Sequence, residues 1–181
     1  AAFDDSSWRV ADAPGSAAQV YTAAEKGQPA LAMSDYGFHR GDIWYRGRFT
    51  TGSGTPAGTG ALDLQLFYGA GGAGLVQVWV DGRFVGQHEL DTGRAFPETT
   101  DTFRLALKDL PAGEHVLAVM VRNMGHNWDL FADDAHKEAR GLISASLAPR
   151  GGARWAVPIA WKLQGAPEAI TDLVRGPYAN G

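Results

Sequence analysis

The sequence contains no cysteine in its 181 residues. A chain without thiols forms no disulfides, offers no thiolate nucleophile and binds no zinc through cysteine. Its longest purely apolar stretches are a few residues, far below the ~20 that a membrane-spanning helix needs, so we expect no membrane partner. The lack of cysteine is compatible with either redox environment, and of the compartments we favour the extracellular one.

An excess of charge of one sign is also missing. The 16 basic and 20 acidic residues are spread along the chain and give a formal net charge of −4. Because neutralising the phosphates of a nucleic acid requires a basic face, we expect no nucleic-acid partner.

A sustained helical period is absent as well, and we expect at most short helical turns within 17–26 and 129–139. Apolar and polar residues instead alternate in short runs rich in valine, leucine and aromatic residues, which is the pattern of half-buried strands. This alternation predicts strands over residues 43–50, 61–68, 75–90, 101–107, 115–122, 141–147 and 155–163.

The clearest unit is 75–90, where Asp81-Gly82 separates two alternating runs and predicts a hairpin with a type I′ turn. The glycine-rich stretches 52–60 and 69–74 are expected to be exposed loops. Many short strands with almost no helix predict an all-β fold. We expect one domain over residues 1–181, an antiparallel β-sandwich of the jelly-roll type.

The N-terminal half carries one group of candidate binding residues. Trp44 and Arg46 lie in a strand where aromatic and guanidinium side chains alternate, so that they could stack on a sugar ring and donate to its hydroxyls. The alternative is a core aromatic face backed by a salt-bridged outer face. The opening FDDSSW, from Phe3 to Trp8, favours a local turn that docks Trp8 onto the sandwich.

A second group follows the strand that ends at Arg122. Polar side chains that surround a tryptophan at a strand end are typical of carbohydrate sites, because the indole stacks on C–H faces while amides and carboxylates bind hydroxyls. The alternative is that the asparagines brace a long loop through bonds to its backbone. The candidate carbohydrate-binding residues here are Asn123, His126, Asn127, Trp128, Asp129 and Arg140.

Catalytic and metal chemistry find little support. The glutamates fall outside the aromatic-rich motifs, no G-x-S-x-G elbow is present, and we predict no catalytic residue and no cofactor. The acidic and histidine side chains after Arg122 fit neither a His-Glu-x-x-His helix nor an EF-hand loop, so we predict no metal site, a loop-oxygen site for a hard cation being the alternative. The residues concerned are His126, Asp129, Asp133, Asp134 and His136.

The ordered motifs resemble those of one enzyme family. The chain is similar to the C-terminal jelly-roll domains of glycoside hydrolase family 35 β-galactosidases, and the similarity covers most of its length. The combination of the last three motifs is the most specific part of this resemblance. The matching motifs are FDDSSW, DYGFHRGDIWYRGRF, VWVDGRFVG, VRNMGHNWD, EARGLI and WKLQG.

The resemblance implies a galactose-binding-like β-sandwich that belongs to a retaining β-galactosidase. In that family the two catalytic glutamates lie in a separate (β/α)₈ barrel, and 181 residues are too few for the ~250 that such a barrel needs. We therefore expect a non-catalytic module that binds a galactoside or another carbohydrate, packs on the catalytic barrel as a scaffold, or does both. The alternative is a small stand-alone hydrolase or cupin-like enzyme that uses His126 or His136.

Overall fold

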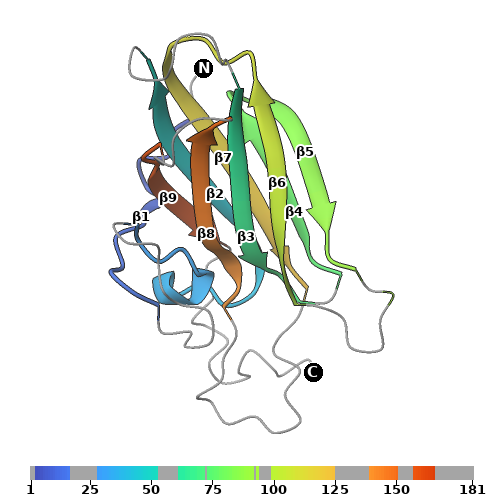
Figure 1. Cartoon of the computed structure of the whole chain (residues 1–181). Helices are drawn as coiled ribbons and strands as arrows, with labels where there is room; N and C mark the ends of the chain where they lie inside the picture. Colours follow the sequence, from blue (N-terminus) through green and yellow to red (C-terminus); the bar gives the residue numbers. More distant parts are fainter. Residues whose placement is uncertain are drawn as a thin grey trace, which may run out of the picture.

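The computed structural model describes residues 3–16, 28–52, 61–71, 73–91, 93, 99–124, 139–150 and 157–165. These residues form two antiparallel sheets that pack face to face as a β-sandwich (Figure 1). No helix in this part of the chain is long and apolar enough to cross a membrane. The predicted all-β sandwich is confirmed.

One sheet has six strands and the other has three. The six-stranded sheet has the order β1-β9-β2-β7-β4-β5, and the three-stranded sheet has the order β6-β3-β8. The strands are β1 Arg9–Val10, β2 Gly41–Thr51, β3 Ala61–Gly69, β4 Leu75–Val80, β5 Arg83–Glu89, β6 Thr100–Lys108, β7 Gly113–Asn123, β8 Gly141–Pro149 and β9 Ala160–Gly165.

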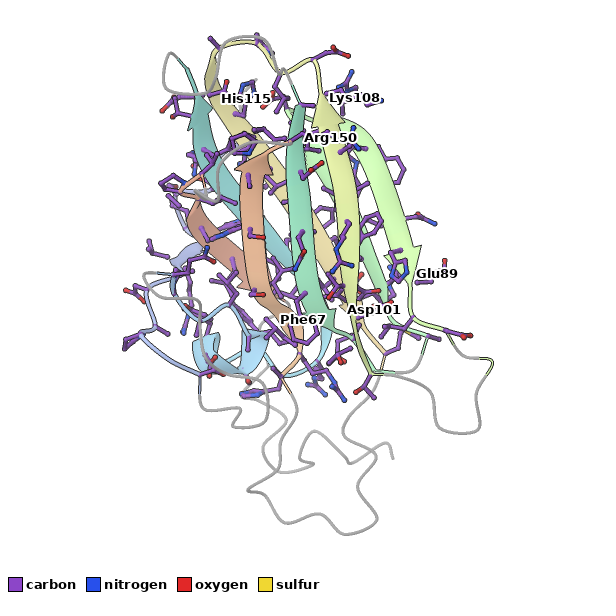
Figure 2. All side chains as sticks on the ribbon, in the orientation of Figure 1. Phe67, Glu89, Asp101, Lys108, His115 and Arg150 are labelled. Carbon is purple, nitrogen blue, oxygen red and sulfur yellow. The ribbon has the colours of Figure 1, made fainter. Side chains whose placement is uncertain are left out.

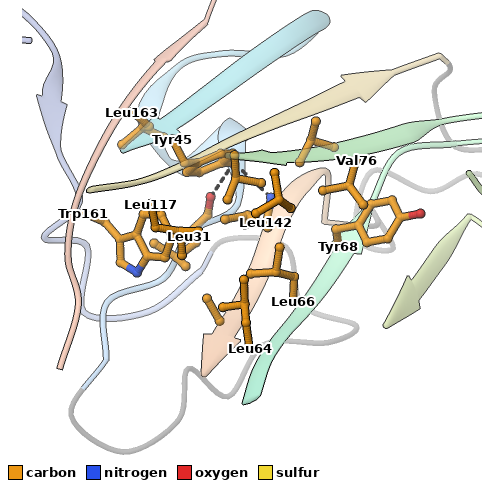
Figure 3. Close-up of a cluster of buried hydrophobic side chains, with 14 of the residues drawn as sticks. Leu31, Tyr45, Leu64, Leu66, Tyr68, Val76, Leu117, Leu142, Trp161 and Leu163 are labelled. Atoms are coloured by element: carbon orange, nitrogen blue, oxygen red, sulfur yellow. Dashed lines mark hydrogen bonds between the residues drawn. The ribbon is translucent and has the colours of Figure 1, made fainter. Parts of the chain in front are cut away.

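Alternation along each strand places one face of each sheet in a shared core. In β3, for example, Leu62, Leu64 and Leu66 are buried while Asp63 and Gln65 are exposed. Side chains from both sheets join the same hydrophobic cluster, which Figure 3 shows in part. Removing this apolar area from water is the main stabilising contribution to the fold.

The predicted hairpin is present as β4 and β5. Asp81 and Gly82 have φ values of 50° and 79°, so both central residues of the turn are left-handed, as a type I′ turn requires. The Asp81 carboxylate also accepts a hydrogen bond from the Val116 N–H at 2.8 Å, which ties the turn to β7.

Two predictions about segments are wrong. The last strand runs over Ala160–Gly165 instead of 155–163, because Pro158 has no N–H to donate to a sheet. The described part of the glycine-rich stretch 69–74 is largely buried, with Ala70 fully buried. It is held by hydrogen bonds from Ala70 N to Thr99 O and from Met124 N to Ala70 O, so it belongs to the packed end of the sandwich.

Other segments were not foreseen or are not described. The two-residue β1 and the 3₁₀ turn η1, Met33–Tyr36, carry no periodic signal in the sequence. The helical turns expected within 17–26 and 129–139, and the glycine-rich stretch 52–60, lie almost wholly outside the described residues.

Tyr45 joins the two sheets through its hydroxyl. Its fully buried side chain leaves β2, donates a hydrogen bond to Leu31 O at 2.8 Å and accepts one from Leu142 N, in β8, at 3.0 Å (Figure 3). Burial raises the pKa of the Tyr45 phenol above its ordinary value, so the hydroxyl keeps the proton that it donates. Gly141 makes room for this contact, since a Cβ on it would collide with the Tyr45 hydroxyl and its φ is +82°.

Replacing Tyr45 by Phe tests this junction. The change leaves the Leu142 N–H and the Leu31 carbonyl without the hydroxyl, and we expect the free energy of unfolding to fall by about 1 to 3 kcal/mol in urea titrations. The control is Thr50→Ala on the exposed side of the same strand, for which we expect less than about 0.5 kcal/mol. Equal losses in the two variants would contradict a role for the hydroxyl.

Candidate functional site

The outward face of the six-stranded sheet carries a row of partly exposed aromatic rings. Trp44 projects from β2, Trp79 from β4 and Phe84 from β5. The ring centroids of Trp44 and Trp79 are 5.3 Å apart, and those of Trp79 and Phe84 are 5.5 Å apart. Trp44 is 38% exposed and Phe84 is 50% exposed, so the row faces solvent. We call these three rings the aromatic row.

The two indoles lie on either side of β7. In the register of the sheet Trp44 stands beside Met120, and Trp79 stands beside Ala118. Met120 also points outward, yet it is only 4% exposed and lies outside the main core cluster. Large side chains on the outer face therefore cover it, and the small Ala118 leaves room for the indoles to approach each other.

Polar side chains border the aromatic row on one side. Gln77 Nε2 donates to Gln87 Oε1 at 3.0 Å. Along β4 and β5 this pair is the outward-facing neighbour of the pair Trp79 and Phe84. Beyond them Arg122 makes a bidentate contact with Asp42, with both N–O distances at 3.0 Å. These pairs hold amide and guanidinium groups in place, beside the rings, with some donors and acceptors still facing water.

The N-terminal residues Phe3–Trp8, which we call the N-terminal strap, border the row on the other side. Asp5 is 5% exposed and anchors the strap to β2 and β9. Its carboxylate contacts Arg46 at 3.1 Å, Arg48 at 2.6 Å and Lys162 at 3.3 Å. Burial alone would raise the pKa of Asp5, but the hydrogen bonds from Arg48 and Lys162 outweigh it and lower the pKa below its usual value.

Within the strap the predicted local turn is present. Ser6 N donates to Asp4 Oδ1 at 2.9 Å, which is an Asx turn, and Trp8 packs its edge against the Phe3 ring with 5.6 Å between centroids. Trp8 is half-buried and is not a member of the core cluster. It therefore supports the strap rather than the interior of the sandwich.

The outer face of the three-stranded sheet is chemically different. Its strands present Asp63, Gln65, Arg104 and Ser146, with a hydrogen bond of 3.2 Å between Arg104 and Gln65. A polar outer face is the ordinary solution for a sandwich in water. Toward the end of this sheet Phe67 of β3 packs against the small apolar cluster of Ala32, Ala139 and Ile143. The row of neighbouring aromatic rings is thus a feature of the six-stranded sheet among the described residues.

The sequence-based candidates fall into two places. Trp44 and Arg46 lie on the outward face of β2, where the core aromatic residue is their neighbour Tyr45. Asn123 and Arg140 are both buried, Asn123 as the last residue of β7 and Arg140 just before β8. The other candidates, His126, Asn127, Trp128 and Asp129, lie outside the described residues, as do Asp133, Asp134 and His136.

Asn123 and Arg140 share one end of the sandwich. The hydrogen bond from Met124 N to Ala70 O brings the end of β7 to the end of β3, and Gly69 of β3 pairs with Gly141 of β8. These bonds link the chain next to Asn123 with the chain next to Arg140. The outward-facing Trp44 and Arg46 belong to a different surface.

Two histidine networks lie at opposite ends of the sandwich, near the labels of His115 and Asp101 in Figure 2. The buried His115 contacts Asp81 Oδ2 through Nδ1 at 2.7 Å and Thr51 Oγ1 through Nε2 at 3.0 Å. Its Nε2 also lies 2.8 Å from Pro111 O, so both ring nitrogens contact groups of the protein itself. This network has a structural role, because it connects the turn at Asp81 with the turn at Pro111.

At the other end His88 is stacked on Phe103, with 5.4 Å between ring centroids, and its Nδ1 lies 2.9 Å from the Tyr68 hydroxyl. Burial raises the pKa of Tyr68 above its ordinary value, with the charges of Asp101 and Glu89 adding to the shift. Among the described residues no three histidines or carboxylates stand close enough to hold a metal ion. The aromatic row is therefore the strongest candidate for binding within the described part of the chain.

Comparison with known proteins places the chain. The sequence model of the family described as "Beta-galactosidase second all-beta domain" matches residues 3–127. The chain belongs to this family. It is 36% identical to a β-galactosidase of Aspergillus niger over 99% of its own length, and 32% identical to a probable β-galactosidase C of Neosartorya fischeri, again over 99%.

The chain spans only 17% of the length of these two relatives. Among solved structures it is similar to a β-glycosidase from Bacteroides vulgatus, with 20% identity, a TM-score of 0.39 and coverage of 91% of this chain and 17% of that chain. The family model and these relatives show an all-β domain of β-galactosidase-like proteins, as the resemblance implied.

The ion pairs of Asp5 predict that the stability of the chain depends on pH. Because the folded-state pKa of Asp5 is below its usual 3.8, its stabilising contribution is present above about pH 4 and is lost as the pH falls through the folded value. We expect Asp5→Asn to lower the free energy of unfolding by about 1 to 3 kcal/mol at pH 7, with the difference from wild type shrinking toward pH 2.

The matched control is Asp63→Asn, because the side chain of Asp63 is 53% exposed and lies 3.5 Å from Arg150. For this surface pair we expect less than about 0.5 kcal/mol at any pH. Chemical unfolding of the three proteins at several pH values provides the measurement. A constant difference between wild type and Asp5→Asn down to pH 2 would show that the ion cluster is not what the substitution removes.

Proposed function

We propose that this chain is an accessory module of a β-galactosidase-like glycoside hydrolase and that it binds carbohydrate through the outer face of its six-stranded sheet. The observation that carries the proposal is the aromatic row, Trp44, Trp79 and Phe84, held in the open by the sheet and bordered by paired polar side chains. The relatives' name, β-galactosidase, makes galactosides the first ligands to test.

The chemistry of this face suits a sugar. The faces of indole and phenyl rings offer flat apolar area to the C–H faces of a pyranose, and the bordering amides and guanidinium groups can exchange hydrogen bonds with its hydroxyls. The rings are inclined to one another, by 33° between Trp44 and Trp79 and by 64° between Trp79 and Phe84, so a sugar ring stacks on one of them at a time. We therefore expect weak affinity and little loss of conformational freedom on binding.

Of the sequence-based candidates, Trp44 and Arg46 belong to this proposed surface. Asn123 and Arg140, at one end of the sandwich, remain proposed as a second carbohydrate-binding group. His126, Asn127, Trp128 and Asp129 lie outside the described residues and stay candidates from the sequence pattern. Neither group requires a metal ion or a cofactor in this proposal.

An architectural role is the second candidate. The chain spans 17% of its relatives, so a large remainder of such a protein stands beside it, and we propose the catalytic barrel as the neighbour on which it packs. Exposed aromatic side chains are also what a docking surface between domains presents. In this reading the aromatic row would be covered in the whole protein and would be free only in the isolated chain.

Replacing Trp44 by Ala tests the carbohydrate proposal. We expect the 181-residue chain to bind galactose, lactose or galactan with Kd values in the millimolar range, followed by tryptophan fluorescence and NMR shifts, and Trp44→Ala to weaken binding about tenfold. The control is Gln65→Ala on the polar outer face of the other sheet, which should leave binding unchanged.

The same samples separate the alternatives. The absence of any saturable change with all three sugars would remove the carbohydrate role and leave the architectural one. Turnover of a chromogenic galactoside by the purified chain, abolished by His126→Ala, would instead establish an independent enzyme, and we expect no turnover.

A further inference from the structure

We infer that the binding surface continues from the aromatic row across Arg46 to Phe3, so that its ligand is an extended oligosaccharide chain rather than a single sugar. This inference rests on the proposed function, because it specifies the ligand class of the same face. It adds the N-terminal strap, whose aromatic residues Phe3 and Trp8 lie outside the core cluster.

Phe3 is exposed and yet held in place. Its side chain is 62% exposed, the Arg46 guanidinium lies 4.9 Å from its ring centroid, and Trp8 contacts the ring edge. Arg46 Nη1 also donates to Phe3 O at 3.0 Å, and the same nitrogen is 3.1 Å from the buried Asp5 carboxylate. An exposed aromatic side chain that is ordered before binding costs little entropy when it packs on a ligand.

Phe3 lies beside the aromatic row because of Arg46. In the sheet register one line across the outer face passes from Lys162 through Arg46 and Ala118 to Trp79 and then to Phe84. Arg46 thus contacts the strap on one side and lies in register with Trp79 on the other, with Trp44 as the next outward residue of β2. The aromatic surface therefore extends over the strap, β2, β4 and β5.

The length of this surface exceeds one sugar ring. Neighbouring strands lie about 4.8 Å apart, so the three steps from β2 to β5 span roughly 14 Å before the strap is added. A single pyranose is about as wide as one of the aromatic rings and would cover only a part of this line. Several linked sugars, each over a ring or a polar neighbour, match the whole of it.

The ion pairs on this face leave hydrogen-bond donors for hydroxyl groups. Arg122 is held by Asp42 in a bidentate pair, and the single Asp5 carboxylate is shared by Arg46, Arg48 and Lys162. The guanidinium N–H groups that these pairs leave over can donate to the hydroxyls of a sugar chain.

Phe3→Ala is the deciding variant, because removing an exposed ring leaves the core and the Asp5 anchor intact. We propose to measure the Kd of galactose, of the disaccharide and of the tetrasaccharide prepared from β-linked galactan by NMR titration of the whole chain. For wild type we expect the tetrasaccharide to bind about tenfold more tightly than the monosaccharide.

In Phe3→Ala this gain with ligand length should fall to about threefold or less, while the affinity for the monosaccharide stays unchanged. Trp44→Ala should weaken both ligands, and Gln65→Ala should weaken neither. Equal affinity of wild type for the two ligands, or an unchanged tetrasaccharide affinity in Phe3→Ala, would overturn the extended site while the proposed function stands. Absence of binding by wild type to every sugar would overturn the proposed function itself.

The second variant, Asp5→Ala, checks the mechanism by freeing the strap. Provided that circular dichroism shows the folded sheet, it should behave like Phe3→Ala toward the tetrasaccharide although Phe3 is still present. If it folds and keeps the full gain with length, the strap does not need its anchor to bind and the proposed pre-organisation is wrong. If it unfolds, the comparison of Phe3→Ala with wild type decides alone.

Discussion

The hydroxyl of Tyr45 is the constraint on which the rest of the sandwich depends. A sandwich core is apolar, and a polar atom inside it is tolerated only when its hydrogen bonds are complete. This hydroxyl bonds to Leu31 on one side and to Leu142 on the other, so it fixes β2, the segment before η1 and β8 relative to one another. Apolar packing alone would allow the two sheets to slide, whereas this contact has a single geometry.

Fixing Tyr45 inward also fixes its neighbours outward. Side chains along a strand alternate between faces, so a shift of one residue in β2 would bury Trp44 and Arg46 and expose Tyr45. The inward position of Tyr45 therefore also determines that Trp44 and Arg46 face outward, where they form the aromatic row and the contact with the strap. The Asp5 cluster acts from outside in the same sense, because Arg46 and Arg48 reach it only from the outward positions of β2.

Alternation made most of the fold predictable, since Leu62, Leu64 and Leu66 can only face a core and Asp81-Gly82 can only turn. It could not reveal β1, which is too short to show a period, or the burial of Ala70, which depends on backbone bonds between distant segments. Trp44 was found from its motif, but Trp79 was missed. Trp79 alternates with Val76, Val78 and Val80, which face the core, so the sequence already places it on the outward face. Only the pairing of β2 and of β4 with β7 brings it next to Trp44.

The strand order has a further consequence for how the chain folds. Of the pairings among the described strands, only that of β4 with β5 joins neighbours in sequence, and β1 meets β9 across almost the whole chain. Each non-local pairing has to overcome the entropy of closing a long loop before its contacts stabilise it. The hairpin at Asp81-Gly82 is thus the natural place for folding to start, and the strap and its aromatic surface are completed only after β9 is in position.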